Sequence, residues 1–246
     1  MTGRVSAQGQ VFDANRAIGR ISLSVAAQQG ETRRVRVDEA GSLRVRFPNV
    51  DAGECEAVIV NTAGGIAGGD RFDLDIEVGP QARLTVSGAA AEKIYRTHGP
   101  ASEIAVRLDV GRGATLRWLP QETILFDRTR MTRRIDVDLA EDASLLLVEA
   151  IVFGRSAMGE AVNTGAMSDR WRVRRDGRLL FADTVEFDGD IAQRLSQKAA
   201  ADGGVALLVD YGAWAEVTGD TLQAVRDHAP WPVLSTPGEA DLSSHV

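Results

Sequence analysis

The sequence predicts an all-β protein whose strands are wound into a solenoid-like stack of sheets, with one or two minor helices. Apolar and polar residues alternate with a period of two in several segments, as they do in half-buried strands. Such segments recur roughly every 8–12 residues, with Gly, Pro or Asp between them, which is the rhythm of all-β proteins. In addition, one short pattern occurs three times along the chain.

The clearest strand is Arg71–Gly79. Its apolar residues (Phe72, Leu74, Ile76 and Val78) alternate with charged ones (Arg71, Asp73, Asp75 and Glu77). One face is therefore expected to be buried and the other to face solvent. The same alternation predicts four further strands, at Ala82–Gly88, Glu103–Gly111, Ala114–Leu119 and Arg134–Ala140.

A β-hairpin is predicted over Trp171–Asp183. Asp176 and Gly177 lie between two strand-like runs there, and Asp-Gly is a strong signal for a two-residue hairpin turn. The preceding stretch, Gly154–Arg170, contains three glycines and is interpreted as an ordered loop rather than a helix.

One helix is predicted near the end of the chain, over Thr218–Pro230. Asp220 is a candidate N-cap, Gln223 follows three residues later, and Pro230 ends the pattern. We expect a single β domain over residues 1–234 and a polar, flexible tail over residues 235–246.

The repeated pattern consists of a turn, then Ala-x-Leu-x-apolar, then an apolar or aromatic pair before an arginine. Its alanines are Ala82, Ala114 and Ala143, which are spaced 32 and 29 residues apart. A recurrence of this kind predicts stacked, similarly wound strand units.

Composition narrows the class of protein. The 246 residues carry 28 basic and 35 acidic side chains, a net charge of −7, which argues against a nucleic-acid partner. The one cysteine, Cys55, excludes an internal disulfide framework and is expected to be inert. No apolar run reaches the roughly 18 residues of a membrane span, and no signal peptide is recognisable, so we expect a cytoplasmic protein without a membrane partner.

The run NTAGGIAGGD, Asn61–Asp70, raises the question of a phosphate-binding loop. A P-loop requires a lysine and a hydroxyl residue after the last glycine, but this chain has Asp70-Arg71. A dinucleotide-binding turn opens into a helix, whereas this one opens into a strand. The glycines (Gly64, Gly65, Gly68 and Gly69) are therefore interpreted as tight turns, and Asp70 is left as a turn residue, an ion-pair partner or a metal ligand.

Carboxylates inside apolar runs are the main candidates for a polar site. Glu149 lies within Leu145–Phe153, where a charge is costly to bury unless it is paired, hydrogen-bonded or metal-bound. Two readings stay open: a buried ion pair with Arg155 or Arg170, or an interior site that handles a cation. Glu122 also borders an apolar run.

Enzymatic motifs are not apparent. The three histidines, His98, His228 and His245, lack the spacing of a zinc or nickel chelate. No GxSxG, HExxH or Ser-His-Asp order stands out. We therefore expect a protein that is not an enzyme.

Four segments, TAGGIAGGD, KIYR, WLPQETILFD and EAIVFGRSAMGE, in this order and spacing, resemble the UreD (UreH) family of urease accessory proteins, over about residues 41–190. The resemblance implies a non-enzymatic maturation factor with a wound all-β fold. It further implies binding to urease apoprotein and, with UreF and the GTPase UreG, delivery of nickel, in a 2:2 complex with UreF. No cofactor is expected to be tightly bound, and nickel is expected to bind transiently along an internal water-filled passage.

By position within the family motifs, the resemblance implies that Asp70, Glu149 and Glu160 line this passage, with Glu122 and Ser87 as further candidates. Arg155 is expected to have a structural role, pairing with one of these acids. The family usually has a Thr-rich segment where this chain has VSGAAAEKIYR, so Ser87 and Gly88 replace more polar positions.

Two other hypotheses remain. The chain could be a purely structural adaptor that bridges UreF and UreG to urease without contacting metal. Alternatively, it could be a hydrolase that uses Asp70 and Glu149 as an acid–base pair, which requires both carboxylates to face one accessible pocket.

Overall fold

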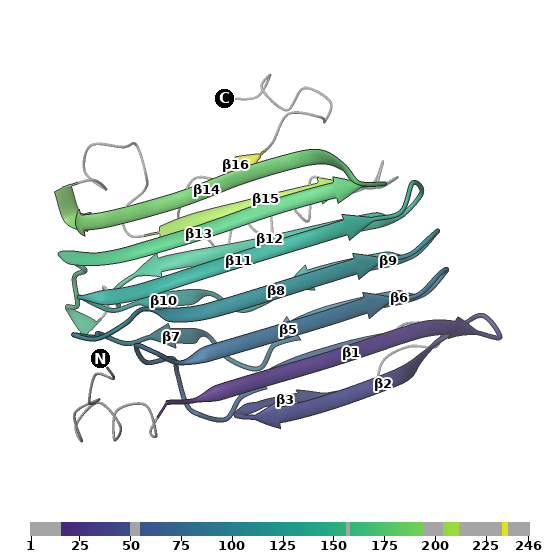
Figure 1. The fold of residues 1–246 in the computed structure, drawn as a ribbon, viewed down its shortest axis with the longest axis horizontal. Helices are drawn as coiled ribbons and strands as arrows, with labels where there is room; N and C mark the ends of the chain where they lie inside the picture. Colours follow the sequence, from purple (N-terminus) through teal and green to yellow (C-terminus); the bar gives the residue numbers. More distant parts are fainter. Residues whose placement is uncertain (1–15, 50–54, 156–157, 194–203, 212–232, 236–246) are drawn as a thin grey trace, which may run out of the picture.

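The computed structural model describes residues 16–49, 55–155, 158–193, 204–211 and 233–235. Two sheets lie one above the other and face each other across a common core (Figure 1). The expected all-β, solenoid-like fold is confirmed. No helix in the described ranges is long and apolar enough to span a membrane.

Sheet A, the front layer in Figure 1, is formed by seven strands of the described residues. Its five inner strands run parallel to one another, and an antiparallel strand forms each edge. In spatial order the strands are β14 (Arg178–Asp190), β13 (Thr164–Arg175), β11 (Thr129–Leu139), β8 (Ser102–Val110), β5 (Arg71–Val78), β1 (Ile18–Gln28) and β2 (Glu31–Gly41).

Sheet B lies behind sheet A and has nine strands in the described part of the chain. Its main path is β16 (Val233–Ser235), β15 (Gly204–Tyr211), β12 (Ser144–Phe153), β9 (Thr115–Leu119), β6 (Arg83–Gly88), β4 (Cys55–Asn61) and β3 (Leu43–Arg46). Two short strands, β7 (Glu92–Ile94) and β10 (Thr123–Leu125), pair with each other, and β10 also pairs with β12.

The chain alternates between the sheets, so that each turn of the solenoid adds one strand to each sheet. The three repeated alanines stand at equivalent corners and are buried. In each corner the alanine N–H donates to the carbonyl three residues earlier, at Gly79, Gly111 or Ala140. The corners stack, because Thr115 N donates to Ala82 O and Ser144 N donates to Ala114 O. The predicted repeat is thus the winding unit of the fold.

Alternation along the strands places apolar residues between the sheets. In sheet A, Ile76, Leu108, Val137 and Val173 stand side by side on neighbouring strands, and all are buried. Burial of one such side chain contributes about 1.5–3 kcal/mol. The core therefore runs along the whole described stack rather than forming a single central cluster.

Several sequence predictions can be compared directly. The hairpin is confirmed: β13 and β14 are antiparallel, and Asp176 and Gly177 take the positive φ values of 47° and 75° that their two-residue turn requires. The loop expected over Gly154–Arg170 is shorter than predicted, since β13 already begins at Thr164. The helix predicted over residues 218–230 and nearly all of the predicted tail lie outside the described residues.

Candidate functional site

Sheet B is interrupted along one line of short connecting segments. We call these segments, residues 62–65, 89–91 and 120–122, the seam. In two successive turns of the solenoid the strand stops and restarts: β6 gives way to β7, and β9 gives way to β10. In contrast, β12 continues without interruption, pairing with β9 at one end and β10 at the other. Pro120 favours the break because it has no N–H to donate to a ladder.

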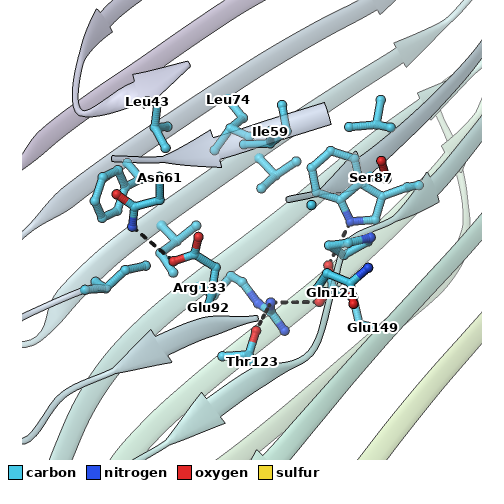
Figure 2. Close-up of a pocket in the computed structure, with 18 of the residues that line it drawn as sticks. Leu43, Ile59, Asn61, Leu74, Ser87, Glu92, Gln121, Thr123, Arg133 and Glu149 are labelled. Carbon is cyan, nitrogen blue, oxygen red and sulfur yellow. Dashed lines mark hydrogen bonds and ion pairs between the residues drawn. The ribbon is translucent and has the colours of Figure 1, made fainter. Parts of the chain in front are cut away.

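A cavity of about 90 Å³ lies under this seam, between the two sheets. Its walls are mostly apolar, and polar groups gather at two places (Figure 2). The volume is sufficient for several water molecules. Ala90 and Gln121 are exposed at the seam, so the cavity has its mouth there, whereas its inner end is closed by buried side chains.

The inner end is formed by the guanidinium of Arg133, which comes from β11 and is only 6% exposed. Its Nη1 donates to Glu149 Oε2 on β12 at 2.8 Å and to Thr123 Oγ1 on β10 at 3.2 Å. Its Nε donates to Asp169 Oδ1 on β13 at 2.9 Å, and Nη2 donates to Asp169 Oδ2. Trp118 Nε1 on β9 donates to Glu149 Oε1 at 2.7 Å. We call Arg133, Glu149 and Asp169 the buried triad.

One guanidinium is thus shared between two buried carboxylates. Burial alone would lower the Arg133 pKa, but the charges of Asp169 and Glu149 outweigh it and the pKa is raised, so Arg133 stays charged. Burial raises the pKa of Glu149, and the Arg133 charge offsets this only in part. The triad therefore has one carboxylate more than its cation can neutralise.

At the mouth, Glu92 and Asn61 form the second polar group of the cavity. Asn61 Nδ2 donates to Glu92 Oε2 at 3.0 Å (Figure 2). Both side chains are half-buried. Burial raises the Glu92 pKa, against the lowering effects of the Asn61 hydrogen bond and the Lys93 charge. Among the described residues, no Arg or Lys forms an ion pair with this carboxylate.

Asp70 holds the glycine run against the start of β1. Its Oδ1 accepts from Ala17 N at 2.8 Å and its Oδ2 accepts from Ala67 N at 2.7 Å. The side chain is buried and is not among the residues that line the cavity. Gly68 lies so close to Thr97 and Pro100 that a Cβ would approach Thr97 Cβ to 2.4 Å. Gly64, Gly65 and Gly69 have positive φ.

The other predicted site residues are dispersed. Ser87 lines the cavity, and its hydroxyl donates to Glu56 Oε1 at 3.0 Å. Glu160 lies outside it and accepts from Arg155 Nε at 2.7 Å. Glu122 belongs to the seam but does not line the cavity. The passage role of Asp70, Glu160 and Glu122 stays a prediction.

The predicted buried ion pair of Glu149 is present, but the predicted partners, Arg155 and Arg170, were wrong. Its partner is Arg133, while Arg155 pairs with Glu160. The acid–base hypothesis also loses its geometric basis, because Glu149 lines the cavity and Asp70 does not. Within the described ranges, no group of three or more His, Cys, Asp or Glu residues is placed to hold a metal ion.

Sequence reasoning missed Arg133, Asp169, Asn61 and Glu92. A signal for the first two was present: Arg133 is two residues from both Met131 and Ile135, and Asp169 is two residues from both Met167 and Trp171. Because residues two apart in a strand lie on the same face, this spacing places both charges on the core face. No comparable signal exists for Asn61 and Glu92, which meet only because successive turns stack.

Fold and site together define a class: a two-layered β-solenoid with a cavity that opens through one sheet. The family model described as UreD urease accessory protein matches residues 17–241. A Urease accessory protein UreD from Rhodopseudomonas palustris (strain BisB18) is 52% identical over 99% of this chain and 86% of its own length. Another, from strain CGA009, is 58% identical over 80% of this chain and 71% of its own. Urease accessory protein UreD 1 of Bradyrhizobium sp. (strain ORS 278) is 49% identical over 97% and 84%. The chain belongs to the UreD family.

Proposed function

We propose that this chain is a urease maturation factor that binds urease apoprotein and, together with UreF and UreG, is required for nickel insertion into the urease active site. Family membership supports the maturation role. The relatives are named as accessory proteins, which supports a scaffold rather than an enzyme.

The single observation that carries a role in nickel transfer is the cavity under the seam. It combines an apolar wall with a half-buried carboxylate at its mouth. Isolated oxygen ligands bind a divalent ion weakly enough to release it, unlike a His/Cys chelate. A cavity of this chemistry suits an ion in transit.

The competing function is a purely structural adaptor with no metal contact. It is favoured by one observation: both oxygens of Asp70 and both of Glu149 already accept hydrogen bonds from the protein. Under this alternative, nickel would be handled by the partner proteins alone.

Plugging the mouth separates the two functions. Ala90 lines the cavity and is exposed, so Ala90→Trp should fill the mouth without removing a polar group. The neighbouring Ala89 is exposed and does not line the cavity, so Ala89→Trp is the matched control.

Each variant would be co-expressed with urease, UreF and UreG. Nickel per urease and co-purification of the partners would both be measured. Nickel transfer through the cavity predicts less nickel in urease with Ala90→Trp, unchanged with Ala89→Trp, and normal co-purification in both. Full nickel loading of urease in the presence of Ala90→Trp would rule out transfer through the cavity and would favour the structural adaptor.

A further inference from the structure

We propose that a divalent cation in the cavity is held at the mouth by the carboxylate of Glu92, and that Glu149, at the inner end, does not bind it. The inference rests on the proposed function, since it concerns the ion that the cavity would carry. It assigns the cation-binding role to a residue that sequence motifs do not indicate.

The inner end is unsuited to a cation because its carboxylates are already engaged. Glu149 Oε1 accepts from Trp118 and Oε2 accepts from Arg133. Both oxygens of Asp169 accept from the same guanidinium. A divalent ion approaching Glu149 would therefore come close to a permanently charged arginine in a poorly solvated place, where like charges repel strongly. Arginines placed in pores exclude cations for this reason.

The carboxylate of Glu92, in contrast, accepts no hydrogen bond from an arginine or lysine of the described residues, although the charge of Lys93 acts on it. Of the two Glu92 oxygens, Oε2 accepts from Asn61, an uncharged donor. Partial burial strengthens the attraction between this carboxylate and an incoming cation. The raised Glu92 pKa has the same origin, because burial disfavours the charge, and the Asn61 hydrogen bond and the Lys93 charge offset this only in part. A bound cation would neutralise this charge and displace the proton.

Further oxygen donors line the same cavity. Gln121 and Ser87 line the same cavity, and the Ser87 hydroxyl donates to Glu56, which leaves its lone pairs available to an ion or its water shell (Figure 2). One carboxylate with neutral oxygens is a weak ligand set, as an ion in transit requires.

The test uses the full-length purified chain and nickel chloride alone, with binding followed by equilibrium dialysis and metal analysis. Glu92→Gln keeps an acceptor for Asn61 and removes the charge. We expect it to weaken nickel binding about tenfold or more, since affinity follows the number of charged ligands. Glu149→Gln and the surface control Glu103→Gln should stay within about twofold of wild type.

A gain-of-function variant excludes misfolding as the explanation. Gln121 is exposed and lines the same cavity, so Gln121→Glu adds a second carboxylate to this cavity. We expect nickel to bind about tenfold more tightly. A merely structural role for Glu92 predicts no such gain.

The possible results distinguish a failure of this inference from a failure of the proposed function. Loss of binding in Glu149→Gln with retention in Glu92→Gln would overturn the inference and leave nickel handling by the cavity standing. Equal binding by wild type and Glu92→Gln would also overturn it. If the wild-type chain takes up no nickel, the metal role of the cavity is lost and the inference is lost with it.

Discussion

Arg133 on β11 and Glu149 on β12 join the two sheets through a hydrogen bond of 2.8 Å between Nη1 and Oε2. Both side chains are almost fully buried. Around them most of the buried side chains between the layers are apolar. The stability of the sandwich near the cavity therefore depends on a charged group that must keep its partners.

Replacing Arg133 should destabilise the fold strongly. Arg133→Met leaves two carboxylates buried without their cation, and breaking a buried ion pair in this way costs about 3–5 kcal/mol. Urea unfolding would measure the loss. The adjacent Arg134 is exposed on the outer face of the same strand, so Arg134→Met is the control and should change stability by less than about 0.5 kcal/mol. Similar effects for both variants would contradict the buried triad.

Glu92 should make stability depend on pH. Its folded-state pKa is raised above the ordinary value of 4.5, so the folded protein binds the proton more tightly than the unfolded chain does. Its contribution is present below 4.5 and is lost as the pH rises through the folded pKa. Glu92→Gln should therefore gain stability relative to wild type as the pH rises through this window.

Urea midpoints measured from about pH 4 to pH 8 would show the difference. Gln121→Ala, a non-titrating change at the same mouth, should give a curve parallel to wild type. A parallel curve for Glu92→Gln as well would refute the assigned pKa shift.

Asp70→Ala should reduce stability by about 2–4 kcal/mol, because it leaves the N–H groups of Ala17 and Ala67 without their acceptor. Asp73 is exposed on β5, and its replacement by alanine should cost less than about 0.5 kcal/mol. Chemical denaturation would compare the two. Loss of urease activation in Asp70→Ala at unchanged stability would instead favour the passage role.

Gly68→Ala should be more disruptive than Gly64→Ala, although both glycines belong to one run. At Gly68 a Cβ would meet Thr97 and the Pro100 carbonyl, and overpacking of this kind costs about 1–3 kcal/mol. At Gly64 the space is open, and only its positive φ opposes a side chain, at a cost of about 1–2 kcal/mol. Thermal unfolding would rank the pair, and the reverse order would contradict the close approach at Gly68.

The sequence was sufficient where one local signal determined the structure. Strict alternation over Arg71–Gly79 marked β5 almost to the residue. The spacing of Ala82, Ala114 and Ala143 indicated the winding unit, because each buried corner accepts only a small side chain. Asp176-Gly177 marked the turn of the hairpin, because its backbone conformation favours those residues.

The cavity could not be predicted from local sequence signals. It exists because β6 and β9 stop at the same level in successive turns, so their breaks align into a seam. Whether Glu149 meets Arg133 or Arg155 depends on which strands face each other across the core. Sequence separation does not reveal this, since Arg133 precedes Glu149 by 16 residues and lies in the other sheet.

The antiparallel strands at the two edges of sheet A have a consequence for self-association. A stack of parallel turns could in principle continue from one molecule into the next and grow into a fibre. Here β2 and β14 reverse direction at the two edges, and a register irregularity interrupts each edge pairing. β2 also carries Arg33, Arg34 and Arg36. Irregular edge pairing, and the charges on β2, discourage the addition of a further strand. Edge-to-edge association of molecules through sheet A is therefore disfavoured.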